Sequence, residues 1–219
     1  MLFRSRRGAI LALLVRLKQI VNHPEAYLRD GRPLAGRSGK FDTVTEIVRS
    51  ARDHGEFVLV FSQFVGTGEL LVAHFADEFG AGSAELLCGA TSVADREDLV
   101  RRFGTEQGPR VLVVSLKAGG VGLTLTAATR VVLFDRWWNP AVEDQAINRA
   151  HRIGAAGAVT VTRYLSADTI EERIDEVLRK KRDLSDTILS QAEAPASSGL
   201  TAEDLFSLFR LAPPNRAAA

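Results

Sequence analysis

Three polar side chains, Gln145, Arg149 and Arg152, recur at intervals of four and three residues in the segment after Pro140. In a helix this spacing places all three side chains on one face. Two guanidinium groups on one face repel each other unless an anion or a carboxylate lies between them, and their planar forks suit bidentate phosphate contacts. The spacing alone leaves open whether this face binds phosphate, is simply exposed, or pairs with a neighbouring acid.

A glycine-rich segment follows the apolar run 110–115 and could form a second phosphate-binding element. It contains Lys117, Gly120 and Gly122. Glycines allow backbone N–H groups to approach a ligand closely, so the loop could cradle a phosphate or a ribose. Glycine-rich turns are also common at strand ends that bind nothing, so the loop by itself is weak evidence.

Two adjacent tryptophans, Trp137 and Trp138, precede Asn139 and Pro140. We expect a strand to pass into a helix here, because proline suits the first helical turn. Neighbouring side chains of an extended segment point to opposite sides, so the two indoles cannot both face the interior. The pattern leaves two interpretations open: one indole faces a groove or partner, or it packs on the following helix.

Two further motifs resemble nucleotide-binding signatures but lack the required context. The segment Gly31–Ser38 has the spacing of a phosphate loop with arginine in place of lysine, yet it follows no strand and contains a proline. Asp175 and Glu176 resemble a metal-holding acidic box, yet they fall within a long helical pattern. We reject the first as a phosphate loop, and we expect the second to be a solvated helix face that pairs with Arg179 and Lys180.

The composition is that of an ordinary globular protein. The 219 residues include 46% apolar and 25% charged residues, and the net charge of +1 excludes histone-like bulk electrostatics but not a local basic surface. The single Cys88 excludes a disulfide framework and, with only four histidines, argues against a structural zinc site, so we expect no metal site. No membrane-spanning run occurs, so we expect no membrane contact and a reducing, cytoplasmic compartment.

Apolar runs alternate with amphipathic helical patterns through most of the chain. The expected strands are 57–61, 84–88, 110–115, 130–135 and 158–165, and the expected helices are 40–53, 67–79, 92–103, 141–152 and 168–190. Strands that are apolar on both faces and alternate with helices predict an α/β fold with a parallel sheet covered on both sides. Ligands of such sheets bind at the carboxyl ends of the strands.

Three segments make up the predicted organisation. We expect residues 1–37 to form a helical segment and linker, residues 38–190 the sheet domain, and residues 191–219 a flexible linker with a short docking helix. The helical pattern that begins at Ile10 and ends before Pro24 is apolar over so wide a face that it must pack on another element. The first twenty residues carry five bases and no acid, which indicates a nucleic-acid-facing end or, more commonly, a solvated helix face.

In this order, these pieces resemble the C-terminal RecA-like lobe of the Snf family of DNA-dependent ATPases, in helicase superfamily two. The resemblance runs from about Leu11 to Arg182, and the shared order of the pieces makes it highly specific. The matching segments are Leu17–Pro24 before the lobe, Ser38–Phe41 at its start, Phe61–Phe64 as motif IV, Leu87–Arg96 after it, Ser115–Thr126 as motif V, Asp135–Pro140 as the tryptophan-containing stretch, Gln145–Gly154 as motif VI, and Thr169–Ile174 in the closing helix.

The resemblance implies that ATP, with Mg²⁺, lies between two lobes in the complete enzyme. Arg149 and Arg152 would be the catalytic residues of this lobe, acting as arginine fingers on the γ-phosphate. Gln145 and the backbone around Gly120 and Gly122 would assist in binding the nucleotide. The N-terminal RecA-like lobe would be the partner that holds most of the Mg²⁺ ligands.

The resemblance also implies contact with double-stranded DNA at the strand-end loops. Gln63, Thr91, Ser115, Lys117 and Trp138 would touch the sugar-phosphate backbone, which gives little base specificity. The expected activity is ATP-dependent translocation along the duplex without strand separation. A protein bound to the DNA is a further partner that this activity would allow.

Some positions depart from the family pattern. Thr124 stands where asparagine is usual, Asn148 where glycine is usual, and Ala155 where glutamine is usual. The sequence also shows no phosphate loop with lysine and no strand-end acidic box, which belong to the first lobe, so we expect the isolated chain to be inactive as an ATPase. Two alternatives stay open: a catalytically silent DNA- or protein-binding module, and a lobe of an RNA helicase.

Overall fold

The computed structural model describes residues 2–115, 124–151 and 157–189. Lys117, Gly120, Gly122, Arg152 and the expected segment 191–219 therefore lie outside the described residues. Among the described helices, none combines the length and the apolar character that crossing a bilayer would require.

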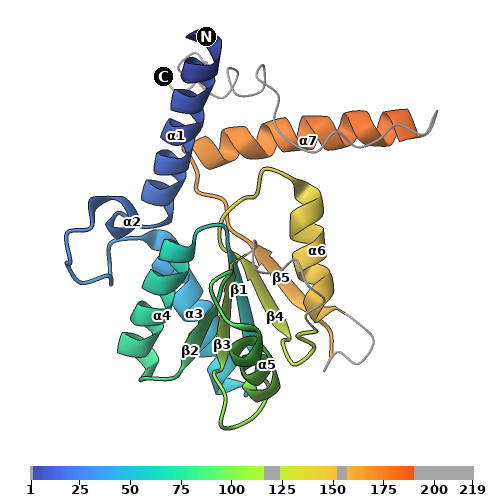
Figure 1. The fold of residues 1–219 in the computed structure, drawn as a ribbon. Coiled ribbons are helices and arrows are strands. Elements are labelled where there is room, and N and C mark those ends of the chain that lie inside the picture. Colours follow the sequence, from blue (N-terminus) through green and yellow to red (C-terminus); the bar gives the residue numbers. More distant parts are fainter. Residues whose placement is uncertain (1, 116–123, 152–156, 190–219) are drawn as a thin grey trace, which may run out of the picture.

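Five parallel strands form a single sheet in the order β2-β3-β1-β4-β5 (Figure 1). The strands are β1 (Val58–Ser62), β2 (Ala84–Leu87), β3 (Val111–Ser115), β4 (Arg130–Leu133) and β5 (Thr160–Arg163). Each lies within two residues of its expected range at either end. The register pairs Ser62 with Ser115, so the carboxyl ends of the two central strands are level with each other.

Seven helices accompany the sheet among the described residues, and the expected parallel α/β fold is confirmed. They are α1 (Leu2–Asn22), α2 (Glu25–Leu28), α3 (Gly39–Asp53), α4 (Val65–Phe79), α5 (Val93–Arg102), α6 (Pro140–Ala150) and α7 (Ile170–Leu189). The side chains of Ser38, Ser92 and Asn139 cap α3, α5 and α6 by accepting backbone N–H groups. Pro140 lies in the first turn of α6, as expected.

The two faces of the sheet carry separate apolar cores. Leu59 and Phe61 of β1 face the helices α5 and α6, whereas Val58 and Val60 of the same strand face α3 and α4. This alternation arises because successive side chains of a strand point to opposite faces. Every residue of β1 and β3 is buried, as expected for central parallel strands covered on both sides.

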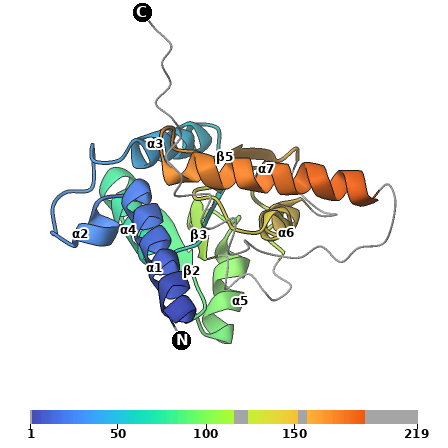
Figure 2. The same ribbon diagram turned by 90° about the horizontal axis from the view of Figure 1, so that it is seen from above.

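Helices α1 and α7 lie beyond the end of the sheet rather than over either face (Figures 1 and 2). A third apolar cluster joins them, formed by Leu14 of α1 with Ile174 and Leu178 of α7, and Trp138 packs against it. The expectation that the amino-terminal helix packs on another element is therefore confirmed. Part of its apolar surface is still exposed, including Leu13 at 47%.

Candidate functional site

Four of the residues predicted to contact DNA lie at or just after the carboxyl ends of four strands. Gln63 follows β1, Thr91 follows β2, Ser115 ends β3, and Trp138 follows β4. Because the strands are parallel and adjacent, these positions belong to one edge of the sheet, which we call the strand-end edge. Gln63, Thr91 and Trp138 are half-buried.

Two hydroxyl groups of the strand-end edge differ in their surroundings. The Thr91 hydroxyl oxygen accepts the backbone N–H of Cys88 at 3.0 Å and so closes the turn after β2. The Ser115 hydroxyl is buried, and within the described residues it has no hydrogen-bond partner. Ser115 is thus the one of the two with a free hydrogen-bonding group at this edge.

Lys18 of α1 reaches into the strand-end edge and contacts two of the predicted DNA residues. It is 0% exposed, and its Nζ donates to Gln63 Oε1 at 2.6 Å and to the carbonyl of Arg136. The same ammonium lies 4.6 Å from the centre of the Trp138 ring, within the range of a cation–π interaction. Burial lowers the pKa of Lys18, and the carboxylates of Asp135 and Glu171 oppose that shift.

Asp135, two residues after β4, connects the same helix to the end of β1. Its Oδ2 accepts the Ser62 hydroxyl at 2.7 Å and the Asn22 amide at 3.0 Å, and its Oδ1 accepts the backbone N–H of Gln63 at 3.0 Å. Asn22 ends α1, whereas Ser62 and Gln63 are consecutive residues at the end of β1. The carboxylate therefore fixes the backbone at Gln63 while Lys18 fixes its side chain.

A buried ion pair lies beside this carboxylate. Lys40, in the first turn of α3, donates to Glu171 Oε1 at 2.7 Å, to the carbonyl of Phe134 and to Asn22 Oδ1. The Glu171 side chain is 0% exposed, and its other oxygen accepts the backbone N–H of Ser166. The pair and its neighbours connect α1, α3, α7 and the residue that follows β4 at the end of the sheet.

Arg136 forms a second buried ionic cluster. Its guanidinium bonds to Glu143 of α6 and lies 2.7 Å from Asp175 of α7, and the Trp137 backbone N–H donates to Glu143 Oε1 at 3.0 Å. Asp175 is 8% exposed, so the expectation of a solvated acidic face is wrong at this position. The expected pairing of Asp175 with Arg179 is present.

Gln145 and Arg149 of the arginine motif lie on α6, and the carboxyl-terminal turn of this helix is buried against the rest of the lobe. Gln145 is exposed, whereas Arg149 is 4% exposed and interacts with a neighbour in the chain. The Arg149 carbonyl accepts the backbone N–H of Leu125 at 3.1 Å, so the last turn of α6 lies against the segment after residues 116–123. The glutamine and the first arginine therefore differ in exposure although their spacing places them on one side of the helix.

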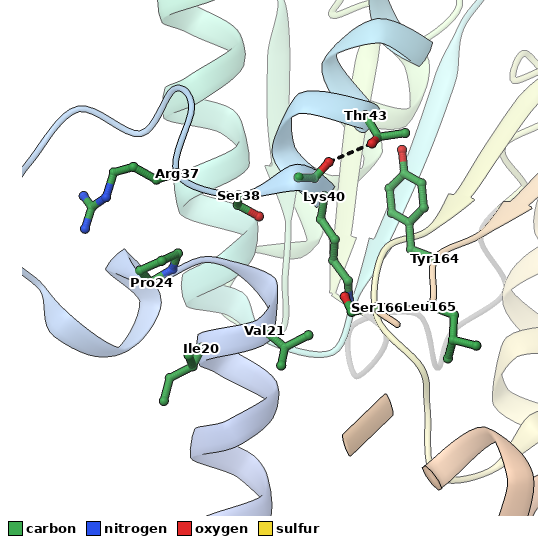
Figure 3. Close-up of a pocket in the computed structure, with 11 residues that line it drawn as sticks. Ile20, Val21, Pro24, Arg37, Ser38, Lys40, Thr43, Tyr164, Leu165 and Ser166 are labelled. Atoms are coloured by element: carbon green, nitrogen blue, oxygen red, sulfur yellow. Dashed lines mark hydrogen bonds between the residues drawn. The ribbon is translucent and has the colours of Figure 1, made fainter. Parts of the chain in front are cut away.

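A cavity of about 500 Å³ lies between the end of α1, the start of α3 and the loop after β5 (Figure 3). Tyr164 borders it, and burial raises the pKa of the Tyr164 phenol, whose oxygen has no partner among the described residues. Arg37, at the end of the rejected phosphate-loop motif, pairs with Asp30 and Glu25. Carboxylates therefore already occupy the arginine that a phosphate would need.

Sequence reasoning missed the residues that hold this site together. Lys18, Asn22, Lys40 and Asp135 lie in segments that resemble the family, but no role was predicted for any of them. A signal was available, because Ile10, Leu14, Lys18 and Asn22 follow one another at intervals of four. A lysine on the buried stripe of an otherwise apolar helix indicates a buried partner.

The comparisons with known proteins agree with this geometry. Residues 39–154 match the family model described as "Helicase conserved C-terminal domain". The chain is 41% identical to "Putative ATP-dependent helicase/translocase YwqA" of Bacillus subtilis, over 94% of this chain and 22% of that protein. It is 36% identical to a solved structure from Sulfolobus solfataricus, "SWI2/SNF2 ATPase core in complex with dsDNA", with a TM-score of 0.74 over 95% of this chain and 43% of that one.

A second solved structure matches most of its own length. The "SWI2/SNF2 ATPase C-terminal domain" of Sulfolobus solfataricus is 36% identical, with a TM-score of 0.72, and the alignment covers 95% of this chain and 84% of that one. The chain spans only about a fifth of the curated relative from Bacillus subtilis, at 22% of its length. The five-stranded parallel sheet, the family match and these relatives agree: the chain belongs to the helicase C-terminal domain family and is a second RecA-like lobe of the SNF2 type.

Proposed function

We propose that this lobe is the second motor lobe of an ATP-dependent translocase that moves along double-stranded DNA. The observation that carries the proposal is the convergence of Gln63, Thr91, Ser115 and Trp138 at the strand-end edge. These residues come from four loops that are far apart in the sequence. Their amide, hydroxyl and indole groups suit the sugar-phosphate backbone, so binding would show little base specificity.

On the nucleotide side, Arg149 and Arg152 would act as arginine fingers on the γ-phosphate of ATP. An arginine finger contributes about 10³–10⁵ in rate, or roughly 4–7 kcal/mol of barrier, whereas a surface ion pair contributes about 0–1 kcal/mol. Arg149 would exchange or share its present neighbour in the lobe when the two lobes close. Gln145 and the backbone at Gly120 and Gly122 would add N–H donors to phosphate or ribose.

Mg²⁺ would be held mainly by the first lobe. The groups that this lobe would turn toward the nucleotide are mainly amide, guanidinium and backbone N–H donors, which bind phosphate oxygens, and no carboxylate is among them to bind a divalent cation. When bound, Mg²⁺ supplies charge neutralisation on the phosphates. The isolated chain would therefore be inactive as an ATPase, and activity would return when the first lobe is supplied.

The test is DNA-stimulated ATP hydrolysis by the two-lobe enzyme that carries Arg152→Ala. We expect kcat to fall by about three orders of magnitude or more, with the thermal unfolding midpoint almost unchanged. Arg101→Ala is the matched control, because the Arg101 side chain is 79% exposed and pairs with Asp98 on the surface of α5. A loss of less than tenfold in Arg152→Ala would contradict the arginine-finger role and favour a catalytically silent module.

DNA contact is tested separately by the salt dependence of duplex binding. Contacts to phosphates release counterions, so affinity should fall steeply between about 50 and 200 mM salt. With a net charge of +1, the isolated chain should bind weakly even at low salt. A binding curve that does not change over this salt range would contradict backbone contact at the strand-end edge.

A further inference from the structure

We propose that Lys18 is a positioning residue that orients Gln63 and Trp138 toward DNA, which makes α1 part of the strand-end edge. The proposal rests on the proposed function, because it assigns a role to a residue that acts through two of the proposed DNA contacts. Lys18 lies outside the segment 39–154 that matches the family model. It is nevertheless fully buried against that segment.

The first step of the argument is the direction of the Gln63 amide. An ammonium group can only donate hydrogen bonds, so the atom of Gln63 at 2.6 Å from Lys18 Nζ must be the carbonyl oxygen. The Nε2 amide nitrogen is bonded to the same carbon and therefore points away from the Lys18 ammonium. No hydrogen bond among the described residues uses that nitrogen, and the side chain is only half-buried. The two N–H groups are thus left for an acceptor from outside, and phosphate oxygens are acceptors only.

The second step is the placement of Trp138. The Lys18 ammonium lies 4.6 Å from the centre of the indole ring, and Leu14 and Ile174 form the cluster on which the ring packs. Cation–π attraction is strongest over the ring face, so the charge and the cluster together fix the orientation of the indole. The half-buried ring and the Gln63 carbonyl oxygen thus share one ammonium group, at 4.6 Å and 2.6 Å.

The third step is that packing alone does not require a charge here. Burying an ammonium group is costly, and a methionine would fill the same space without that cost. Three ties of this one ammonium, to Gln63, to the Arg136 carbonyl and to the Trp138 ring, offset the cost. The charge therefore serves orientation, and orientation set in advance lowers the entropy lost when DNA binds.

The experiment compares Lys18→Met with Arg16→Met in the full-length enzyme, since Arg16 is an exposed cation of the same helix. Fluorescence anisotropy with a labelled duplex gives Kd, and ATPase assays give the DNA concentration for half-maximal rate. We expect both quantities to rise about threefold to tenfold in Lys18→Met, with kcat at saturating DNA unchanged. Arg16→Met should change them less than twofold at moderate salt. Equal effects of the two variants would overturn the proposal.

A double-mutant cycle with Gln63→Ala separates orientation from a merely structural role. If Lys18 acts through Gln63, the double variant should bind DNA no more weakly than the weaker single variant. Additive losses, or a loss in Lys18→Met with none in Gln63→Ala, would overturn the positioning role. If Gln63→Ala and Trp138→Ala both bind DNA like the wild type, the proposed DNA contact at the strand-end edge is contradicted. The positioning role of Lys18 is then contradicted as well.

Gln63→Glu tests the direction of the amide without changing Lys18. The carboxylate keeps an acceptor for the ammonium, so the fold and the Lys18 contact should persist. It removes the two outward donors and adds a charge that repels phosphate. We expect DNA affinity to fall by at least as much as in Lys18→Met. Wild-type affinity in Gln63→Glu would overturn the proposal even if Lys18→Met failed to fold.

Discussion

The centre of the sheet and its strand-end edge differ in the kind of side chain that they bury. The centre is apolar on both faces, since its two buried strands β1 and β3 consist of valine, leucine and phenylalanine with one terminal serine each. The strand-end edge holds a set of buried charges from segments spread along the chain, namely Lys18, Lys40, Asp135, Arg136, Glu143, Glu171 and Asp175. These side chains are joined mainly by hydrogen bonds and ion pairs between different elements.

The contrast indicates that the two regions have different roles. Apolar burial stabilises a fold and tolerates changes of identity when volume is kept. A buried ion pair contributes little net stability, because desolvation cancels most of the attraction, but it fixes the relative placement of its partners. We interpret the apolar centre as the source of stability and the charged edge as the device that places the loops carrying Gln63 and Trp138.

The largest expected effect comes from a substitution in the apolar centre. Phe75 of α4 is fully buried in the cluster beneath one face of the sheet. Phe75→Ala should lower the free energy of unfolding by about 3–5 kcal/mol, because it removes transfer energy and leaves a cavity. Urea denaturation of the isolated chain measures this. A loss below about 1 kcal/mol would show that this face of the sheet is loosely packed. It would contradict the role of the apolar centre as the source of stability.

A similar loss at the charged edge should be recoverable by a second substitution. Glu171→Leu leaves the Lys40 ammonium buried without its carboxylate and should cost about 3–5 kcal/mol. Adding Lys40→Met removes that unpaired charge, so the double variant should regain at least half of the loss. Urea midpoints of the two variants decide the matter. A double variant as unstable as Glu171→Leu would mean that the pair stabilises the fold directly.

A smaller effect concerns pH and the apolar side. His74 is buried, its Nε2 lies 2.8 Å from the Thr45 hydroxyl, and burial lowers the pKa of the imidazole below its ordinary value of 6.5. The unfolded chain therefore binds a proton at His74 more readily than the folded chain does. The free energy of unfolding is then undiminished by this group above about pH 6.5 and decreases as the pH falls below that value.

Unfolding measured at pH 7.5 and 5.5 checks this window for His74. His74→Gln should show a smaller loss between the two pH values than the wild type, because it removes the group that must be protonated on unfolding. Parallel changes in the two proteins would assign the pH dependence to other groups. In that case the buried imidazole would add nothing to the acid sensitivity of the lobe.

The smallest expected effect belongs to neither region. Glu46 and Arg49 form an ion pair on the surface of α3, with side chains 70% and 45% exposed. Glu46→Gln should change the free energy of unfolding by less than about 0.5 kcal/mol, because solvent and salt screen the pair. Urea titration at low and high salt measures the change. A loss comparable to that of Glu171→Leu would erase the distinction between surface and buried pairs.

Sequence patterns predicted the apolar side well and the charged edge poorly. The strands are short apolar runs between turn residues, so Val58–Ser62 and Val111–Ser115 lie within a residue of the expected ranges. The expected starts of α3 and α6, at residues 40 and 141, each lie one residue from the observed starts, and Ser38 and Asn139 cap these helices. Strands and helix starts depend on residues that are close together in the chain, so a single sequence is enough to predict them.

The charged edge depends on which distant segments meet, and a single sequence does not show that. Asp175 was expected on a solvated face because it lies in a charged helix, yet its partner Arg136 lies 39 positions earlier in the chain. Lys18 was counted among the basic residues of the amino-terminal end, and its partner Gln63 is 45 positions away. Charged residues are usually exposed, so pattern alone assigns them to the surface.

The most direct test of the motor-lobe account is a structure of the full-length enzyme with duplex DNA and a non-hydrolysable ATP analogue. The account predicts that the guanidinium groups of Arg149 and Arg152 lie within about 3 Å of γ-phosphate oxygens. It also predicts that the DNA backbone lies along the loops that carry Gln63 and Trp138. Both arginines pointing into solvent, away from the nucleotide, would contradict the account.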